Sequence, residues 1–109
     1  MLIEDRRLRL QSVLESILGS RNVYFQPPAN TIMRYPCIVY SFTGTYGTKA
    51  DNIDYLTSDA YDVTLITKDP VFGEINERIL EIPHCRFSRK YTADNLHHFS
   101  YSLRITGKD

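Results

Sequence analysis

Apolar residues recur at helical spacing near the N-terminus. The spacing of i, i+3, i+4, i+7 and i+8 is typical of a helix with one face against a core. This spacing is found in Leu10, Val13, Leu14, Ile17 and Leu18. The pattern predicts an amphipathic helix over residues 3–18, ended by Gly19.

Three arginines of this helix fall mainly outside the apolar stripe. They are Arg6, Arg7 and Arg9. A solvated outer face is the simplest interpretation of such charges, and contact with a phosphate or an acidic partner is the alternative.

Five segments carry the β-branched, aromatic or alternating pattern of strands. They are residues 23–26, 37–42, 60–67, 86–91 and 99–105. The last is the clearest, because Phe99, Tyr101, Leu103 and Ile105 alternate with polar residues. In the third, Tyr61, Val63 and Leu65 share one face.

A second helix is predicted between the third and fourth of these strands. Asp69 offers an N-cap acceptor, and Pro70 suits the first helical position. The apolar stripe consists of Phe72, Ile75, Ile79 and Ile82, and Pro83 ends the helix.

The predicted elements follow the order α-β-β-β-α-β-β in one domain, residues 1–109. Strands outnumber helices and several are joined by hairpin-type links. We therefore expect an α+β fold, with a mainly antiparallel sheet of four to five strands and both helices packed on one face.

The segment between residues 43 and 59 is rich in Gly, Thr, Asp and Asn. It is too long for a tight hairpin, so it is either an extended, mobile loop or the tip of a long β-arm. Its carboxylates do not match a calcium loop, and we expect them to solvate the arm. They are Asp51, Asp54, Asp59 and Asp62.

Thirteen Lys and Arg balance thirteen Asp and Glu among the 109 residues. This neutral total argues against a protein that coats nucleic acid and permits association with partners. A basic, aromatic strand still leaves a β-sheet nucleic-acid-binding module open as an alternative. Its residues would be Arg86, Phe87, Arg89, Lys90 and Tyr91.

No catalytic, cofactor or metal signature stands out, so we expect a protein that is not an enzyme. The five glycines do not form a phosphate loop. A zinc site would have to use His84, Cys85, His97 and His98, but adjacent strand residues point to opposite faces and cannot easily chelate as pairs. A metal-dependent enzyme remains the third hypothesis.

The two cysteines, Cys37 and Cys85, lie in apolar strand contexts and are expected to be buried free thiols, with a disulfide as the alternative. No stretch is long and apolar enough to span a membrane, and no membrane partner is expected. Eight tyrosines without a tryptophan suit sheet edges and an arm covered by neighbouring proteins.

Three stretches resemble small head–tail virion proteins of long-tailed bacteriophages, chiefly the tail-terminator (tail-completion) group. They are residues 34–40 (RYPCIVY), 61–70 (YDVTLITKDP) and 91–99 (YTADNLHHF). The resemblance covers about residues 34–105. It implies a ring, typically a hexamer, that caps the tail tube, docks onto the head connector and lets DNA pass through its lumen.

This resemblance implies a homo-oligomer in the tail or neck of the virion, made in the host bacterial cytoplasm, with tail tube and neck proteins as partners. A head-closure or adaptor protein of the neck is the alternative within the same class. The family has no catalytic residues to carry over. Physical reasoning places the ring and partner contacts at Arg6, Arg9, Tyr46, Lys49, Asp51, Asp54 and Tyr55.

Overall fold

The computed structural model describes residues 3–49, 55–69 and 73–106. In chain order the elements are α1 (Ile3–Leu18), β1 (Val23–Phe25), β2 (Cys37–Lys49), β3 (Tyr55–Thr67), α2 (Gly73–Leu80), β4 (Arg86–Ala93) and β5 (Leu96–Thr106). The predicted α+β class and the order of its elements are confirmed.

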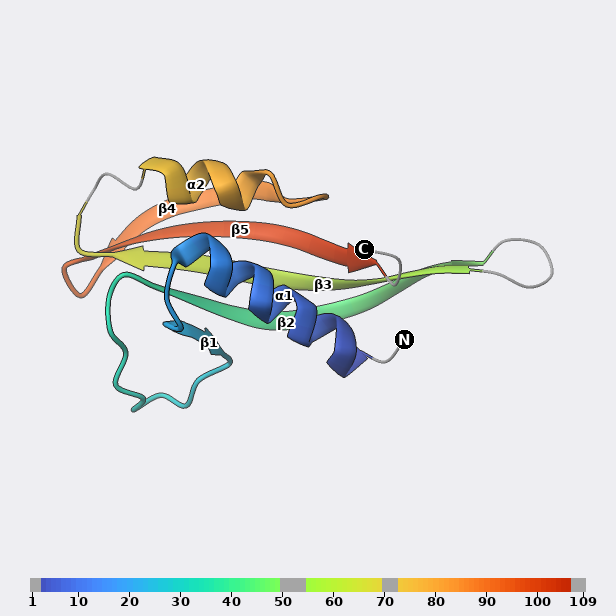
Figure 1. Cartoon of the computed structure of the whole chain (residues 1–109), viewed down its shortest axis with the longest axis horizontal. Coiled ribbons are helices and arrows are strands. Elements are labelled where there is room, and N and C mark those ends of the chain that lie inside the picture. The colour runs from blue at the N-terminus through green and yellow to red at the C-terminus, as the bar shows by residue number, and fades with distance from the viewer. Residues whose placement is uncertain (1–2, 50–54, 70–72, 107–109) are drawn as a thin grey trace.

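The five strands form one sheet in the order β1-β2-β3-β5-β4. The β1–β2 pair is parallel, and the other three pairs are antiparallel. The sheet is therefore mixed but mainly antiparallel. Both helices lie over the same face of it (Figure 1).

The core lies between the two helices and this face of the sheet. From α1 it takes Leu10 and Leu14, and from α2 and the turn after it Ile79 and Ile82. The strands contribute chiefly Ile38, Tyr40, Tyr61, Val63, Leu65, Phe99, Tyr101, Leu103 and Ile105. The predicted alternation in β5 is thus confirmed, as is the shared face of Tyr61, Val63 and Leu65. Neither described helix lies on the other face of the sheet, which is called the helix-free face below (Figure 1).

The first helix has the predicted bounds, and Gly19 ends it in the left-handed region (φ 80°), where glycine meets no steric penalty. Its amide donates to the carbonyl of Glu15 at 2.9 Å. The predicted apolar stripe is too wide, however. Val13 is 43% exposed, because α1 meets the sheet along a narrower line through Leu10 and Leu14.

The second helix is shorter than predicted. It ends at Leu80 rather than at Pro83, and Ile82 is buried from the turn that follows. The predicted start at Pro70 and the apolar position Phe72 lie outside the described residues.

The link between β4 and β5 is a two-residue hairpin that the sequence analysis did not predict. Asp94 and Asn95 both have positive φ (53° and 62°), and Ala93 pairs with Leu96 across them. Two left-handed residues between paired strands are typical of a type I′ turn. The turn extends β4 and β5 beyond their predicted bounds and places His97 and His98 within β5.

Candidate functional site at the base of the β2–β3 arm

A two-stranded arm projects beyond the helices. Strands β2 and β3 stay paired from Cys37 and Ile66 to Lys49 and Tyr55, and their far ends lie well away from both helices (Figure 1). Of the two interpretations of residues 43–59, the β-arm is confirmed and the irregular loop is wrong for the described residues. The tip, residues 50–54, lies outside them.

A buried ion pair lies at the base of the arm. The guanidinium of Arg6 donates to both carboxylate oxygens of Asp59, through Nε to Oδ2 and through Nη2 to Oδ1 at 3.2 Å. Thr45, which faces Asp59 across β2 and β3, donates from Oγ1 to Oδ1 at 3.1 Å. One carboxylate therefore ties α1 to both strands of the arm.

Both members of this pair are inaccessible: Arg6 is 5% exposed and Asp59 is fully buried. The hydrogen bond to Asp59 is the main cause of a raised pKa of Arg6, and it outweighs desolvation. Burial, with a smaller contribution from the charge of Asp59, also raises the pKa of Tyr61 to about 12. Arg6 stays charged, and its charge is neutralised within the chain.

Two sequence-based interpretations are corrected here. Arg6 does not belong to a solvated outer face, because it lies one turn before Leu10 and Leu14 on the line that meets the sheet. Asp59 does not solvate the arm, because its side chain points to the helix-covered face. The spacing of four residues from Arg6 to Leu10 was the signal that could have indicated this.

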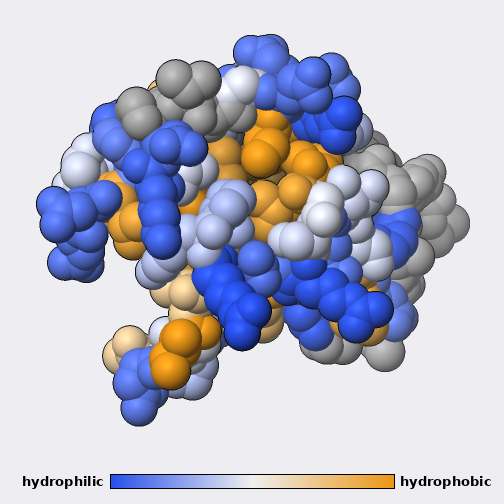
Figure 2. Space-filling model, turned by 60° about the vertical axis from the view of Figure 1, so that its left-hand side comes forward, coloured by the Kyte–Doolittle hydropathy of each residue, from blue (hydrophilic) through white to orange (hydrophobic). Residues whose placement is uncertain are grey.

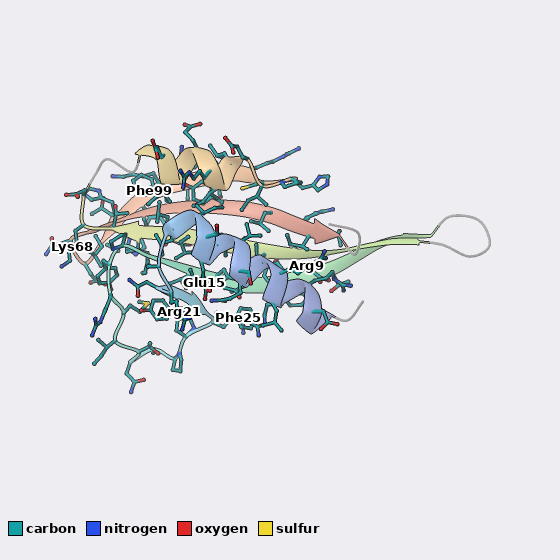
Figure 3. All side chains as sticks on the ribbon, in the orientation of Figure 1. Arg9, Glu15, Arg21, Phe25, Lys68 and Phe99 are labelled. Carbon is teal, nitrogen blue, oxygen red and sulfur yellow. The ribbon has the colours of Figure 1, made fainter. Side chains whose placement is uncertain are left out.

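Next to the ion pair, Arg7 packs on the aromatic side of the core. Its guanidinium lies 4.6 Å from the ring centre of Phe25, close to the first half of α1 (Figure 3), and donates to the hydroxyl of Tyr40 at 3.2 Å. That hydroxyl in turn donates to Oε1 of Gln11 at 2.5 Å. Arg7 is therefore also engaged within the chain.

The other predicted contact residues are placed as follows. Tyr46 and Lys49 lie in the β2 part of the arm and Tyr55 in the β3 part. Asp51 and Asp54 lie outside the described residues. Arg9 is half-buried on the side of α1 that faces the end of β5 (Figure 3).

Arg9 borders an apolar groove between the two helices. The groove has a volume of about 720 Å³, and its apolar lining includes Val13, Ile17, Ile82 and Ile105. In the space-filling view the apolar atoms lie in a hollow with hydrophilic side chains around it (Figure 2). A surface of this kind suits contact with another protein.

The helix-free face of the sheet carries a basic, aromatic stack near β4. The rings of Tyr91 and His98 stack at 4.7 Å, and the guanidinium of Arg89 lies 4.9 Å from the Tyr91 ring centre. Beside it, a polar hollow of about 440 Å³ is lined by His84, Arg86, Ser102 and Arg104.

The histidines and cysteines considered for zinc are not brought together as one set. His98 is in the stack, whereas His97 is on the opposite face of β5. Within the described residues, no three His, Cys, Asp or Glu side chains converge as ligands would. Both cysteines are free, Cys37 buried and Cys85 half-buried, and burial raises the pKa of each thiol to about 11.

No described helix has the length and apolarity needed to cross a membrane. No family model and no curated protein matches the sequence. Among solved structures, the chain is similar to one in the "Virion of native gene transfer agent (GTA) particle". The TM-score is 0.39 and the identity 14%, over 94% of this chain and 90% of that chain. A likeness this distant carries no functional conclusion.

Proposed function

We propose that this chain is a structural assembly protein of a bacteriophage-like virion, a tail terminator whose ring caps the tail tube and joins it to the head connector. The observation that carries the proposal is the projecting β2–β3 arm with its locked base, in a sequence that resembles tail terminators at residues 34–40, 61–70 and 91–99.

The arm supports an assembly role for a physical reason. A two-stranded ribbon is marginally stable by itself and gains stability when something packs on it or pairs with it. The Arg6–Asp59 pair and the Thr45 hydrogen bond fix the base of this ribbon relative to α1. A fixed, projecting element of this kind suits a head-to-tail contact, which closes into a ring when its rotation permits.

Removal of the arm tip tests the proposal. Deletion of residues 47–54 joins Tyr46 to Tyr55 and leaves three residues before Ser58, the register partner of Tyr46, a loop length that hairpins accept. We expect the shortened chain to fold, by circular dichroism, and to form no rings, by light scattering and electron microscopy. A matched control replaces residues 50–54 with five Gly and Ser residues and keeps the paired part of the arm.

The biological test is whether complete particles assemble. In the genome that encodes the chain, the deletion should give tails that do not join heads. Infectious or transfer-competent particles made with the deletion variant would contradict the proposal. The position of a labelled ring in electron micrographs of particles distinguishes the two roles within this class. A terminator lies at the end of the tail, whereas a head-closure or adaptor protein lies nearer the portal.

A β-sheet nucleic-acid-binding module is the second candidate, and the stack of Arg89, Tyr91 and His98 favours it. Exposed aromatic rings beside cations bind single strands in a salt-sensitive way. Alanine at Arg89 and Tyr91 together should abolish retardation of a labelled oligonucleotide at low salt. The absence of any retardation by the unchanged chain would eliminate this candidate.

A further inference from the structure

The polar hollow beside β4 has the composition of an anion site. Its volume is about 440 Å³, and its lining consists of His84, Arg86, Ser102 and Arg104. Each of these side chains can donate a hydrogen bond, and none of them is a carboxylate. Two guanidinium groups in a lining without an anion favour a negatively charged ligand.

The register of β4 and β5 brings three of these side chains together. Ser102 and Arg104 alternate with the buried side chains of β5, so they point to the helix-free face. Arg86 lies directly opposite Ser102 and therefore points the same way. Arg104 is its diagonal neighbour, and diagonal positions about 7–8 Å apart are within reach of long side chains.

A tight turn supplies the fourth side chain. The amide of Cys85 donates to the carbonyl of Ile82 at 3.2 Å, which closes a four-residue turn. Pro83 is its second residue, and His84 is its third, with a positive φ of 64°. This is typical of a type II turn, in which glycine or asparagine is the usual third residue. A histidine therefore occupies a backbone position that is costly for it, and its imidazole lines the hollow.

The charges around the hollow agree with an anionic ligand. Among the described strand residues, the helix-free face carries Arg86, Arg89 and Arg104 against one carboxylate, Asp62. Asp62 faces Ser102 from β3, on the side away from β4, and does not line the hollow. The hollow is therefore on the most cationic part of this face.

We propose that the hollow binds a phosphate group between the guanidiniums of Arg86 and Arg104, with the hydroxyl of Ser102 and the imidazole of His84 as further donors. A guanidinium binds two phosphate oxygens through parallel N–H donors, and hydroxyl groups commonly add a contact. All four residues are exposed, so a phosphate within a polymer can reach the site as well as a free ion can. This inference goes beyond the proposed assembly role and does not depend on it.

Titration followed by proton–nitrogen correlation spectra tests the site and identifies the source of the phosphate. Inorganic phosphate is one probe and a short DNA duplex is the other, at an ionic strength kept constant with sodium chloride. The backbone signals of residues 84–86 and 102–104 should shift in a saturable way. Saturation by inorganic phosphate alone assigns the site to free phosphate, and saturation by the duplex assigns it to the phosphodiester backbone. Signals that saturate with neither probe would overturn the proposal.

Two pairs of substitutions with the same loss of charge separate a site from general attraction. Arg86→Gln with Arg104→Gln should weaken the saturable binding at least tenfold. The control pair is Arg21→Gln with Arg34→Gln, at exposed positions before and after β1, which is at the opposite edge of the sheet from β4. We expect the control to stay within twofold of the unchanged chain. Equal weakening by the two folded pairs would contradict a site at the hollow.

The turn offers a variant that removes a donor without harming the fold. Glycine is a usual residue where His84 stands, so His84→Gly should unfold at a temperature no lower than that of the unchanged chain. It should still weaken binding of the probe at least threefold, because the imidazole is lost. Unchanged affinity, or a loss of affinity that occurs only with a lower unfolding temperature, would overturn the role of His84 as a donor.

Discussion

Arg6 and Asp59, 53 residues apart in the sequence, form a buried ion pair that joins the first half of α1 to β3. The carboxylate also accepts from Thr45 on β2, so three elements meet at one charged group. The direction of the arm is therefore coupled to the position of α1. A change in this pair should affect both stability and assembly.

The first prediction concerns this pair. Asp59→Asn leaves the guanidinium of Arg6 buried without a counter-ion, and the expected loss is roughly 3–5 kcal/mol of unfolding free energy. Urea unfolding measures it. The double variant Arg6→Met, Asp59→Leu should lose less than Asp59→Asn, because no charge is left uncompensated. A single variant within about 0.5 kcal/mol of the unchanged chain would show that the pair is not buried in solution.

The second prediction concerns the line along which α1 meets the sheet. Leu14 is fully buried, so Leu14→Ala should cost about 2–5 kcal/mol through lost burial and the cavity left behind. Leu8 on the same helix is 50% exposed, and Leu8→Ala should stay within about 0.5 kcal/mol. Comparison of the unfolding free energies of the two variants shows which side of α1 is buried. Similar losses at both positions would mean that α1 is rotated about its axis.

The third prediction concerns the contact between β5 and α2. The buried hydroxyl of Tyr101 donates to Oδ1 of Asn76 at 2.6 Å. Tyr101→Phe keeps the ring and removes this bond, which should cost about 1–2 kcal/mol because the amide oxygen loses its partner. Thermal unfolding measures the loss. If Asn76→Ala costs as much when combined with Tyr101→Phe as it does alone, the two groups do not interact.

The fourth prediction concerns alkaline pH. Burial raises the pKa of Cys37 from 9.0 to about 11, so the folded chain holds this proton more tightly than the unfolded chain does. The resulting stability is fully present below pH 9 and is lost as the pH rises toward 11. Unfolding free energy should therefore fall across this range. Cys37→Ala should reduce the slope, and an unchanged slope would exclude Cys37 as its source.

Sequence periodicity predicted the helices and strands in which buried and exposed side chains recur at a regular spacing. The spacing of Leu10 and Leu14 predicted α1, and the alternation from Phe99 to Ile105 predicted the buried face of β5. Side-chain direction in a helix or strand follows from backbone geometry over a few residues. The α+β class and the order of the elements follow from the same information.

Long-range contacts were decided only by the tertiary structure. The sequence places Arg6 beside an apolar stripe and Asp59 in an acidic, polar segment, and nothing local shows that they face each other. Similarly, the arm exists because β2 and β3 stay paired from Cys37 to Lys49, through a bulge between Phe42 and Gly44, and β1 leaves the outer part of β2 uncovered because it ends after three residues. Periodicity shows which way a side chain points, whereas its partner depends on how distant segments pack.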